Sequence, residues 1–174
     1  REFPLMTTEE ILTSVKGFLY ASSIDLNMGY PSIPLNDKSR KILTIVMPFG
    51  AYECLTLPMG VMPASDLFQA RMVHIFSDMG ENRPFPYIDD VLHFKGPTFE
   101  EHLAILDEIL RRIGEAGLQV STEKSRFCQE SVEYLGFQLK QTGYEPVPSR
   151  VSAILRINPP KDVSGVRSLL GVVN

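Results

Sequence analysis

The chain has 174 residues, of which 44% are hydrophobic and 22% charged, and its formal net charge is −4. These values lie within the ordinary limits of a globular domain that buries one substantial core. The sequence contains no apolar run of about 18 residues and begins without the basic and apolar blocks of a secretion signal, which argues against a membrane span and against export. We therefore expect an intracellular protein.

Charge is distributed unevenly along the chain. Residues 1–123 carry 10 basic and 17 acidic side chains (net −7), whereas residues 124–174 carry 7 basic and 4 acidic side chains (net +3). The overall acidity argues mildly against nucleic-acid binding, because phosphate contacts need a basic surface. If the chain binds a nucleic acid, we therefore expect the phosphate backbone to lie along the C-terminal third. A chance fluctuation of surface charge explains the uneven distribution of charge equally well.

Hydrophobic periodicity divides the chain into helices and hairpins. Thr7 with Glu10 and Thr98 with Glu101 form capping boxes that open two of the helices. The apolar run 18–26 is typical of a strand buried on both faces. In chain order the predicted elements are a helix at 7–17, a strand at 18–26, a hairpin at 41–58, a helix at 64–79, a hairpin at 84–94, a helix at 98–117, a hairpin at 132–146, and short helices at 149–157 and 163–173.

This order of elements predicts an α+β fold, in which a mostly antiparallel sheet has helices packed on one face. Prolines cluster around Glu145 and are followed by two short helical patterns. We therefore predict a subdomain boundary at this point, between residues 1–145 and residues 146–174.

Three aspartates are flanked by apolar residues. Asp25 ends the buried strand, and Asp89 and Asp90 lie at the tip of the 84–94 hairpin. Carboxylates that converge from different strands are what two divalent cations, about 3.5–4 Å apart, need in nucleotidyl transfer. An uncompensated buried charge costs several kcal/mol, so these acids must be paired, neutralised or bound to a cation. Turn geometry alone also explains an Asp-Asp pair at a hairpin tip, and spacing leaves both interpretations open.

Ordered sequence blocks resemble the reverse transcriptases of gypsy-type long-terminal-repeat retrotransposons and retroviruses. The blocks are SSIDLNMGY at 22–30, LPMGVMPASDLFQ at 57–69, YIDD at 87–90, VEYLGFQL at 132–139 and VRSLLGVVN at 166–174. Their order and spacing match as well, over nearly the whole chain. The resemblance implies an RNA-directed DNA polymerase, with the palm and partial fingers at residues 1–145 and the start of the thumb at residues 146–174.

The resemblance also implies roles for individual residues. Tyr30 matches the aromatic residue that crowds the sugar 2′ position, and Lys124 matches a lysine that can protonate the leaving pyrophosphate; a core tyrosine and a solvated lysine explain both residues without a function. The implied catalytic and metal-binding residues are Asp25, Asp89 and Asp90, with Mg²⁺, or alternatively Mn²⁺, as cofactor. The implied nucleotide-binding residues are Met28, Gly29, Tyr30, Met59, Gly60 and Lys124. The implied primer-binding residues are Tyr87, Leu135, Gly136 and Phe137.

The implied partners are an RNA or DNA template-primer, deoxynucleoside triphosphates and the remainder of a Pol polyprotein (fingers, thumb and ribonuclease H), without a membrane. In an active element we expect the protein in the cytoplasm, in virus-like particles. Met59, Pro63 and Ser65 depart from the residues usual in the family, and the resemblance implies that the basic fingers residues belong to a stretch before Arg1. A truncated or domesticated module that acts in binding therefore stays open as an alternative, and we expect weak or no polymerase activity from these 174 residues alone.

Overall fold

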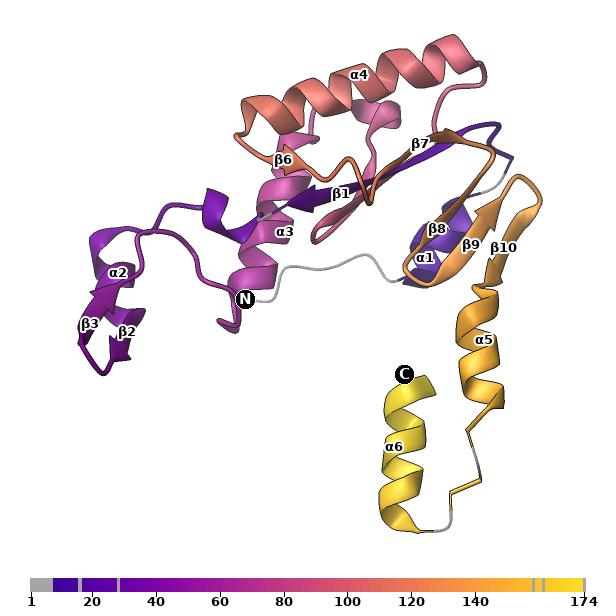
Figure 1. Ribbon diagram of the computed structural model, residues 1–174. Coiled ribbons are helices and arrows are strands. Elements are labelled where there is room, and N and C mark those ends of the chain that lie inside the picture. Colours follow the sequence, from indigo (N-terminus) through magenta and orange to yellow (C-terminus); the bar gives the residue numbers. More distant parts are fainter. Residues whose placement is uncertain (1–7, 16, 28, 158, 161, 174) are drawn as a thin grey trace.

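The computed structural model describes residues 8–15, 17–27, 29–157, 159–160 and 162–173, in which helices alternate with antiparallel strands (Figure 1). The elements are α1 (Thr8–Ser14), β1 (Ala21–Asn27), η1 (Tyr30–Ser32), α2 (Asp37–Ile42), β2 (Thr44–Met47), β3 (Gly50–Glu53), α3 (Ala64–Ile75), η2 (Gly80–Asn82), β4 (Phe85–Tyr87), β5 (Asp90–His93), α4 (Phe99–Glu115), β6 (Gln119–Val120), β7 (Arg126–Gln129), β8 (Ser131–Tyr134), β9 (Phe137–Lys140), β10 (Gly143–Pro146), α5 (Pro148–Leu155) and α6 (Val163–Val173). The predicted α+β class is confirmed.

β1 is the central strand of a five-stranded sheet in which it pairs with β5 on one side and with both β6 and β7 on the other. All of these pairings are antiparallel, and β4 extends the sheet beyond β5. Ile24 and Leu26 of β1 are 0% and 4% exposed, as the apolar run predicted. The strand begins at Ala21, later than the predicted start at Phe18.

Helices α3 and α4 cover one face of this sheet, as predicted. The sheet and the two helices pack together in one hydrophobic core. Its residues are Ile24, Leu26 and Val91 from the sheet, Phe68, Met72 and Phe76 from α3, and Leu106, Ile109 and Ile113 from α4. Thr98 caps α4 by accepting a hydrogen bond from Glu101 N at 3.2 Å, as the capping box predicted. Thr7, the predicted cap of α1, lies outside the described residues.

The opposite face of the sheet carries a second core. Helix α1 contributes Ile11, Leu12 and Val15, and β8 to β9 contribute Val132, Tyr134 and Leu139. β8, β9 and β10 form a three-stranded antiparallel sheet, where the sequence predicted a hairpin. The tip between β8 and β9 is Leu135-Gly136, and both residues have positive φ angles of 48° and 83°. Residues of β8 and of this tip line the same cleft as Asp25 of β1 and Asp90 of β5.

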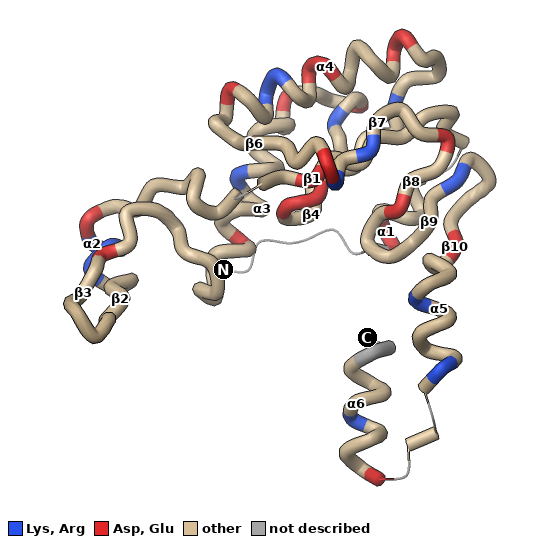
Figure 2. The backbone as a smooth tube through the Cα atoms, in the orientation of Figure 1, with Lys and Arg blue, Asp and Glu red and all other residues tan. Residues whose placement is uncertain are grey.

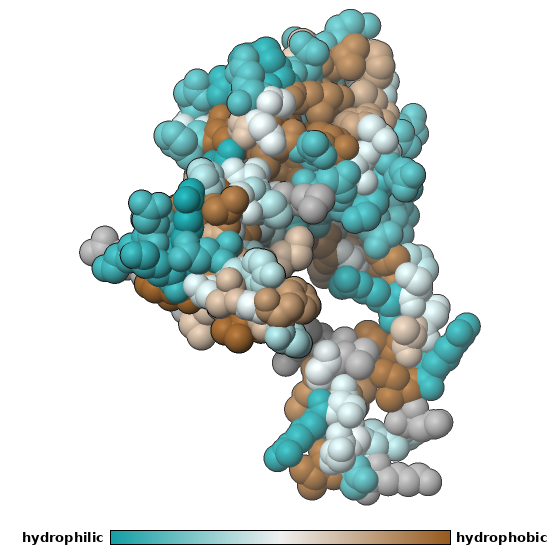
Figure 3. Space-filling model, turned by 60° about the vertical axis from the view of Figure 1, so that its left-hand side comes forward, coloured by the Kyte–Doolittle hydropathy of each residue, from teal (hydrophilic) through white to brown (hydrophobic). Residues whose placement is uncertain are grey.

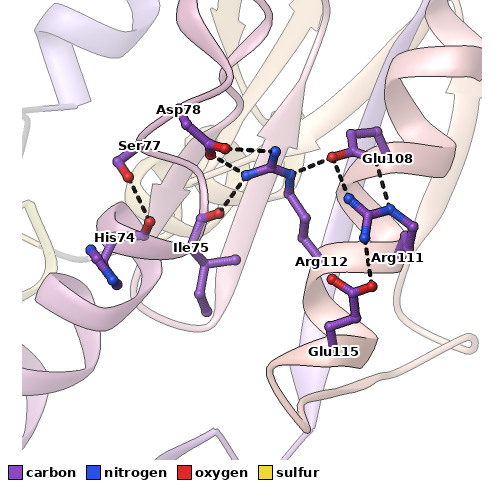
Figure 4. A network of polar contacts seen from close by, with 8 residues as sticks. All are labelled: His74, Ile75, Ser77, Asp78, Glu108, Arg111, Arg112 and Glu115. Atoms are coloured by element: carbon purple, nitrogen blue, oxygen red, sulfur yellow. Dashed lines mark hydrogen bonds and ion pairs between the residues drawn. The ribbon is translucent and has the colours of Figure 1, made fainter.

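An ion-pair network holds the end of α3 against α4 (Figure 4). Arg112 of α4 donates to Ile75 O at 3.0 Å and to both carboxylate oxygens of Asp78. Glu108 accepts from Arg111 and Arg112, and these hydrogen bonds lower the pKa of Glu108 to about 2. Such exposed pairs contribute little energy individually. Their geometric effect is to fix the C-terminal end of α3.

Two parts of the described chain stand away from the main sheet (Figure 1). One is the lobe of α2, β2 and β3, where Val46 is 81% exposed and Phe49 76% exposed. The other is the helical tail of α5 and α6, where Leu155 is 81% exposed. Figure 3 shows hydrophobic side chains on both parts. The division at residues 145 and 146 stays a prediction.

The sequence did not predict α2. Its signal is the Asn36 cap, whose Oδ1 accepts from Ser39 N at 2.9 Å. Among the described helices, none is both long and apolar enough to cross a membrane.

A buried histidine pair lies between β5 and α4. The rings of His93 and His102 stack 4.2 Å apart, and both side chains are 0% exposed. His102 Nδ1 donates to Lys95 O at 2.9 Å, so its neutral Nε2 accepts from Ser22 Oγ, also 2.9 Å away. His93 Nε2 donates to His102 O at 3.2 Å. Burial, and secondarily the neighbouring His102, lowers the pKa of His93 to about 4.

We expect this pair to make the fold sensitive to mild acid. The folded pKa of His93 lies below its ordinary value of 6.5, so the stability that it contributes is fully present above pH 6.5 and is lost as the pH falls toward 4. From pH 7 to pH 5 the free energy of unfolding should fall by roughly 2 kcal/mol on account of this residue. Urea titrations at both pH values measure the fall. His93→Gln, which keeps a donor for His102 O, should remove it, whereas the exposed-residue control His74→Gln should not.

Candidate functional site

Asp25 and Asp90 lie directly opposite one another on β1 and β5. Leu26 N donates to Asp89 O at 2.8 Å, so the neighbouring Leu26/Asp89 pair is the hydrogen-bonded one. Asp25 and Asp90 therefore form a non-hydrogen-bonded pair, in which Cα atoms are about 4.5 Å apart and side chains lie closest. Both side chains line a cleft of about 560 Å³ between the main sheet and the β8–β9 tip. Figure 2 shows acidic segments close together near the labels of β1 and β4.

Asp89 lies in the two-residue turn between β4 and β5. Its neighbour Ile88 has a φ angle of 52°, a conformation that a β-branched residue adopts only under strain. Gln69 of α3, which is 3% exposed, holds this turn. Its Oε1 accepts from Ile88 N at 2.7 Å, and its Nε2 donates to Pro86 O at 2.8 Å. Helix α3 thus fixes the conformation that presents Asp89.

Burial and neighbouring charges raise the pKa values of Asp89 and Asp90. The pKa of Asp90 is raised first by burial and then by the charges of Asp25 and Asp89, and the pKa of Asp89 is raised by burial and by Asp25. Lys124 opposes both shifts. Its Nζ lies 3.4 Å from Asp25 Oδ1, which makes an ion pair but no hydrogen bond. The three aspartates therefore carry more negative charge than Lys124 alone compensates.

The donor chemistry of this cleft suits a hard divalent cation. Asp25 Oδ1 and Asp89 Oδ1 are buried and accept no hydrogen bond, and carboxylate oxygen is the ligand that Mg²⁺ prefers. Across the described parts of the chain, however, no three His, Cys, Asp or Glu side chains are close enough together to hold a metal ion. The fold brings the three aspartates near one another, but their carboxylates are not close enough together to coordinate one metal ion. Their metal-binding role stays a prediction.

The structure also places four other predicted residues at this cleft. Tyr87 is opposite Asp90 across β4 and β5, and Lys124, Leu135 and Gly136 line the cleft. A Cβ on Gly136 would lie 2.0 Å from Arg150 Nη1, so the guanidinium of Arg150 covers the bare Cα of this glycine.

Sequence reasoning missed Ser23, Arg126, Glu133, Tyr134 and Arg150, which line the same cleft. The signal for Arg126 and Arg150 was the excess of positive charge after residue 123. No sequence pattern placed these cations against the acids, because β7 and α5 reach the cleft only through the tertiary fold.

The remaining predicted site residues lie elsewhere. Tyr30 is in η1, with its ring 5.2 Å from that of Phe68 and its hydroxyl 3.4 Å from Ser65 Oγ. Met59 is 66% exposed, and Gly60 follows it in the loop before α3. The half-buried Phe137 packs edge-on against Tyr144 at 5.8 Å. Gly29 is buried against Phe68, and Met28 lies outside the described residues.

Comparison with known proteins decides the family. Residues 2–139 match the family model described as "Reverse transcriptase (RNA-dependent DNA polymerase)". The chain belongs to the reverse transcriptase family. Within that family it is similar to the retrovirus-related Pol polyprotein from transposon gypsy of Drosophila melanogaster, with 32% identity over 172 residues. It is also 27% identical over 173 residues to a Tf2 transposon polyprotein of Schizosaccharomyces pombe.

Solved reverse transcriptases have the same fold. The foamy viral protease-reverse transcriptase in complex with an RNA/DNA hybrid superposes with a TM-score of 0.87 at 29% identity, covering 98% of this chain and 23% of that one. The same enzyme in complex with double-stranded DNA gives a TM-score of 0.86 at 30% identity, covering 98% and 36%. The alignments cover 99% of this reverse transcriptase chain but only 16% of the gypsy polyprotein and 13% of the Tf2 polyprotein.

We expect Gln69→Leu to destabilise the reverse transcriptase chain by about 2 kcal/mol, because it leaves the amide of Ile88 and the carbonyl of Pro86 without partners inside the protein. Urea unfolding at pH 7 measures the loss. Gln119→Leu, at an exposed position on β6, is the matched control. Equal unfolding midpoints for the two variants would show that Gln69 does not hold the turn.

Asp90→Asn should stabilise the metal-free chain. Removal of one of two directly opposed charges relieves up to about 1 kcal/mol, which raises the melting temperature of a domain of this size by about 2–4 °C. The gain should disappear in acid, because the raised pKa of Asp90 means that protonation removes the same repulsion as the pH falls through it.

The measurement is thermal unfolding with and without Mg²⁺, with the exposed residue variant Asp107→Asn as control. Mg²⁺ should raise the melting temperature of the wild type more than that of Asp90→Asn. An Asp90→Asn chain less stable than the wild type at pH 7 would contradict the repulsion.

Proposed function

We propose that this chain is the palm of an RNA-directed DNA polymerase that adds deoxynucleotides to a primer 3′-hydroxyl. One observation carries the proposal: the register of β1 and β5 sets Asp25 opposite Asp90, next to the strained turn that presents Asp89. Two carboxylate oxygens of this group are buried without a hydrogen bond. Acids held in this way are useful where a cation compensates them, as in nucleotidyl transfer.

Asp25, Asp89 and Asp90 would hold Mg²⁺, or Mn²⁺ in its place. Two such ions, when bound, activate the attacking oxygen and stabilise the leaving phosphate. The chain's own residues orient the reaction: Gln69 keeps the turn of Asp89 in one conformation, and the ion pair of Lys124 with Asp25 keeps an ammonium group at the edge of the acids. From there Lys124 can give a proton to the leaving pyrophosphate.

The template-primer would lie along the cationic side of the cleft. Lys124, Arg126 and Arg150 all line it and all belong to the basic C-terminal third, so they can neutralise phosphates close to the acids. The backbone of Leu135-Gly136 would face the primer end. Foamy viral reverse transcriptase, which shares this fold, was solved with an RNA/DNA hybrid and with double-stranded DNA, and this supports a duplex of either kind as the partner.

Primer extension tests the proposal. A polymerase that contains these residues together with fingers and thumb should extend a primer in the presence of Mg²⁺ and deoxynucleotides. Asp89→Asn should lower the rate by at least about 100-fold, because preorganised charge at the reacting phosphate is the main source of catalysis. The control, Asp107→Asn on the exposed side of α4, should extend normally. A folded wild-type polymerase that does not extend a primer would instead favour a module that only binds.

A further inference from the structure

Arg71 of α3 joins the turn after β1 to the end of α4. Its Nη1 donates to Ser32 O at 2.6 Å and to Ser32 Oγ at 3.0 Å, and its Nη2 donates to Ala116 O at 2.6 Å. Ala116 is the C-terminal cap residue of α4, where unpaired carbonyls and the helix dipole favour a cation. The planar guanidinium donates from two nitrogens in one rigid fork, a geometry that the single nitrogen of a lysine does not reproduce.

The turn that Arg71 holds is the one that carries Tyr30. Ser32 Oγ and Ser32 N both donate to Gly29 O, and Ile33 N donates to Tyr30 O at 3.0 Å. On its other side the turn rests on α3, since a Cβ on Gly29 would lie 2.4 Å from the ring of Phe68. The backbone on both sides of Tyr30 is therefore fixed, by the Phe68 ring before it and by the Arg71 guanidinium after it.

The side chain of Tyr30 depends on the same helix. Its ring packs 5.2 Å from the ring of Phe68, and its hydroxyl lies 3.4 Å from Ser65 Oγ. Ser65, Phe68 and Arg71 follow one another at intervals of three residues, so they lie on successive turns of one side of α3. Helix α3 also holds the β4–β5 turn through Gln69. Helix α3 thus fixes the positions of both Tyr30 and Asp89.

We propose that Arg71 is a positioning residue for sugar selection. It fixes the Gly29–Ser32 turn, and this turn sets the position of the Tyr30 ring relative to the aspartates of the cleft. This inference rests on the proposed polymerase function and on Tyr30 as the residue that crowds the sugar 2′ position. Without the guanidinium, Ser32 O and Ala116 O lose their shared donor and the turn relaxes away from α4. The ring then no longer excludes a 2′-hydroxyl.

The test compares Arg71→Met with Arg112→Met in the extension-competent polymerase. Both variants remove an arginine that ties α3 to α4, but Arg112 contacts Ile75, Asp78 and Glu108 and does not touch the Tyr30 turn. The measured quantity is the ratio of kcat/KM for a deoxynucleotide to kcat/KM for the matching ribonucleotide. Hydrogen exchange of the Ser32 and Ile33 amides, measured in the same proteins, reports on the turn independently of activity.

Arg71→Met should lower this ratio by about tenfold or more, mainly by admitting the ribonucleotide, because a ring displaced by about 1 Å loses its steric contact. Exchange at Ser32 and Ile33 should accelerate in this variant only. Arg112→Met should keep the wild-type ratio and the wild-type exchange at these amides. If Arg71→Met does not fold, Arg71→Lys decides, with a smaller fall in the ratio expected.

The positioning role would be overturned by an unchanged ratio in the Arg71 variant, or by an equal fall in both arginine variants. In either case, primer extension by the wild type would still support the polymerase. Absence of extension by the folded wild type would remove the proposed function, and this inference with it. The two failures are therefore distinguishable in one set of proteins.

Discussion

The pairing of β1 with β5 is the constraint on which the rest of the site depends. Because side chains alternate between the faces of a strand, the register that puts Asp25 opposite Asp90 also puts Ile24 and Leu26 into the core beneath α3 and α4. A slip of one residue would bury the acid among the helices and expose the apolar residues. Burial of the apolar face therefore fixes the position of two like charges that would otherwise separate.

Helix α3 holds the two turns that flank these paired strands. Its buried face packs on the sheet through Phe68 and Met72, while Gln69 and Arg71 reach the turns on either side. Both polar side chains bind backbone atoms of these turns, and Arg71 also donates to Ser32 Oγ. A strained turn and a short 3₁₀ segment persist here because one packed helix over-determines them.

The charges around the cleft explain how an acidic chain could bind the polyanionic partner that we propose. The acids lie at the ends of β1 and β5. The cations reach the same cleft from other elements: Lys124 lies just before β7, Arg126 lies in β7 and Arg150 lies in α5. Negative charge is thus concentrated where cations would bind, and positive charge where phosphates would lie. The net charge of the whole chain is an average over these two regions and describes neither.

The sequence by itself determined the fold class, the strand of Asp25, the β4–β5 hairpin and the helices α3 and α4, because hydrophobic period and capping residues are local signals. It also identified the family through ordered motifs. Only the tertiary structure decided that Asp25 opposes Asp90, that β8 to β10 form a sheet, and that Gln69, Arg71 and Arg150 hold or line the site. Those features join residues that are distant along the chain, and a bond between a side chain and a backbone atom far away in sequence leaves no pattern in a single sequence.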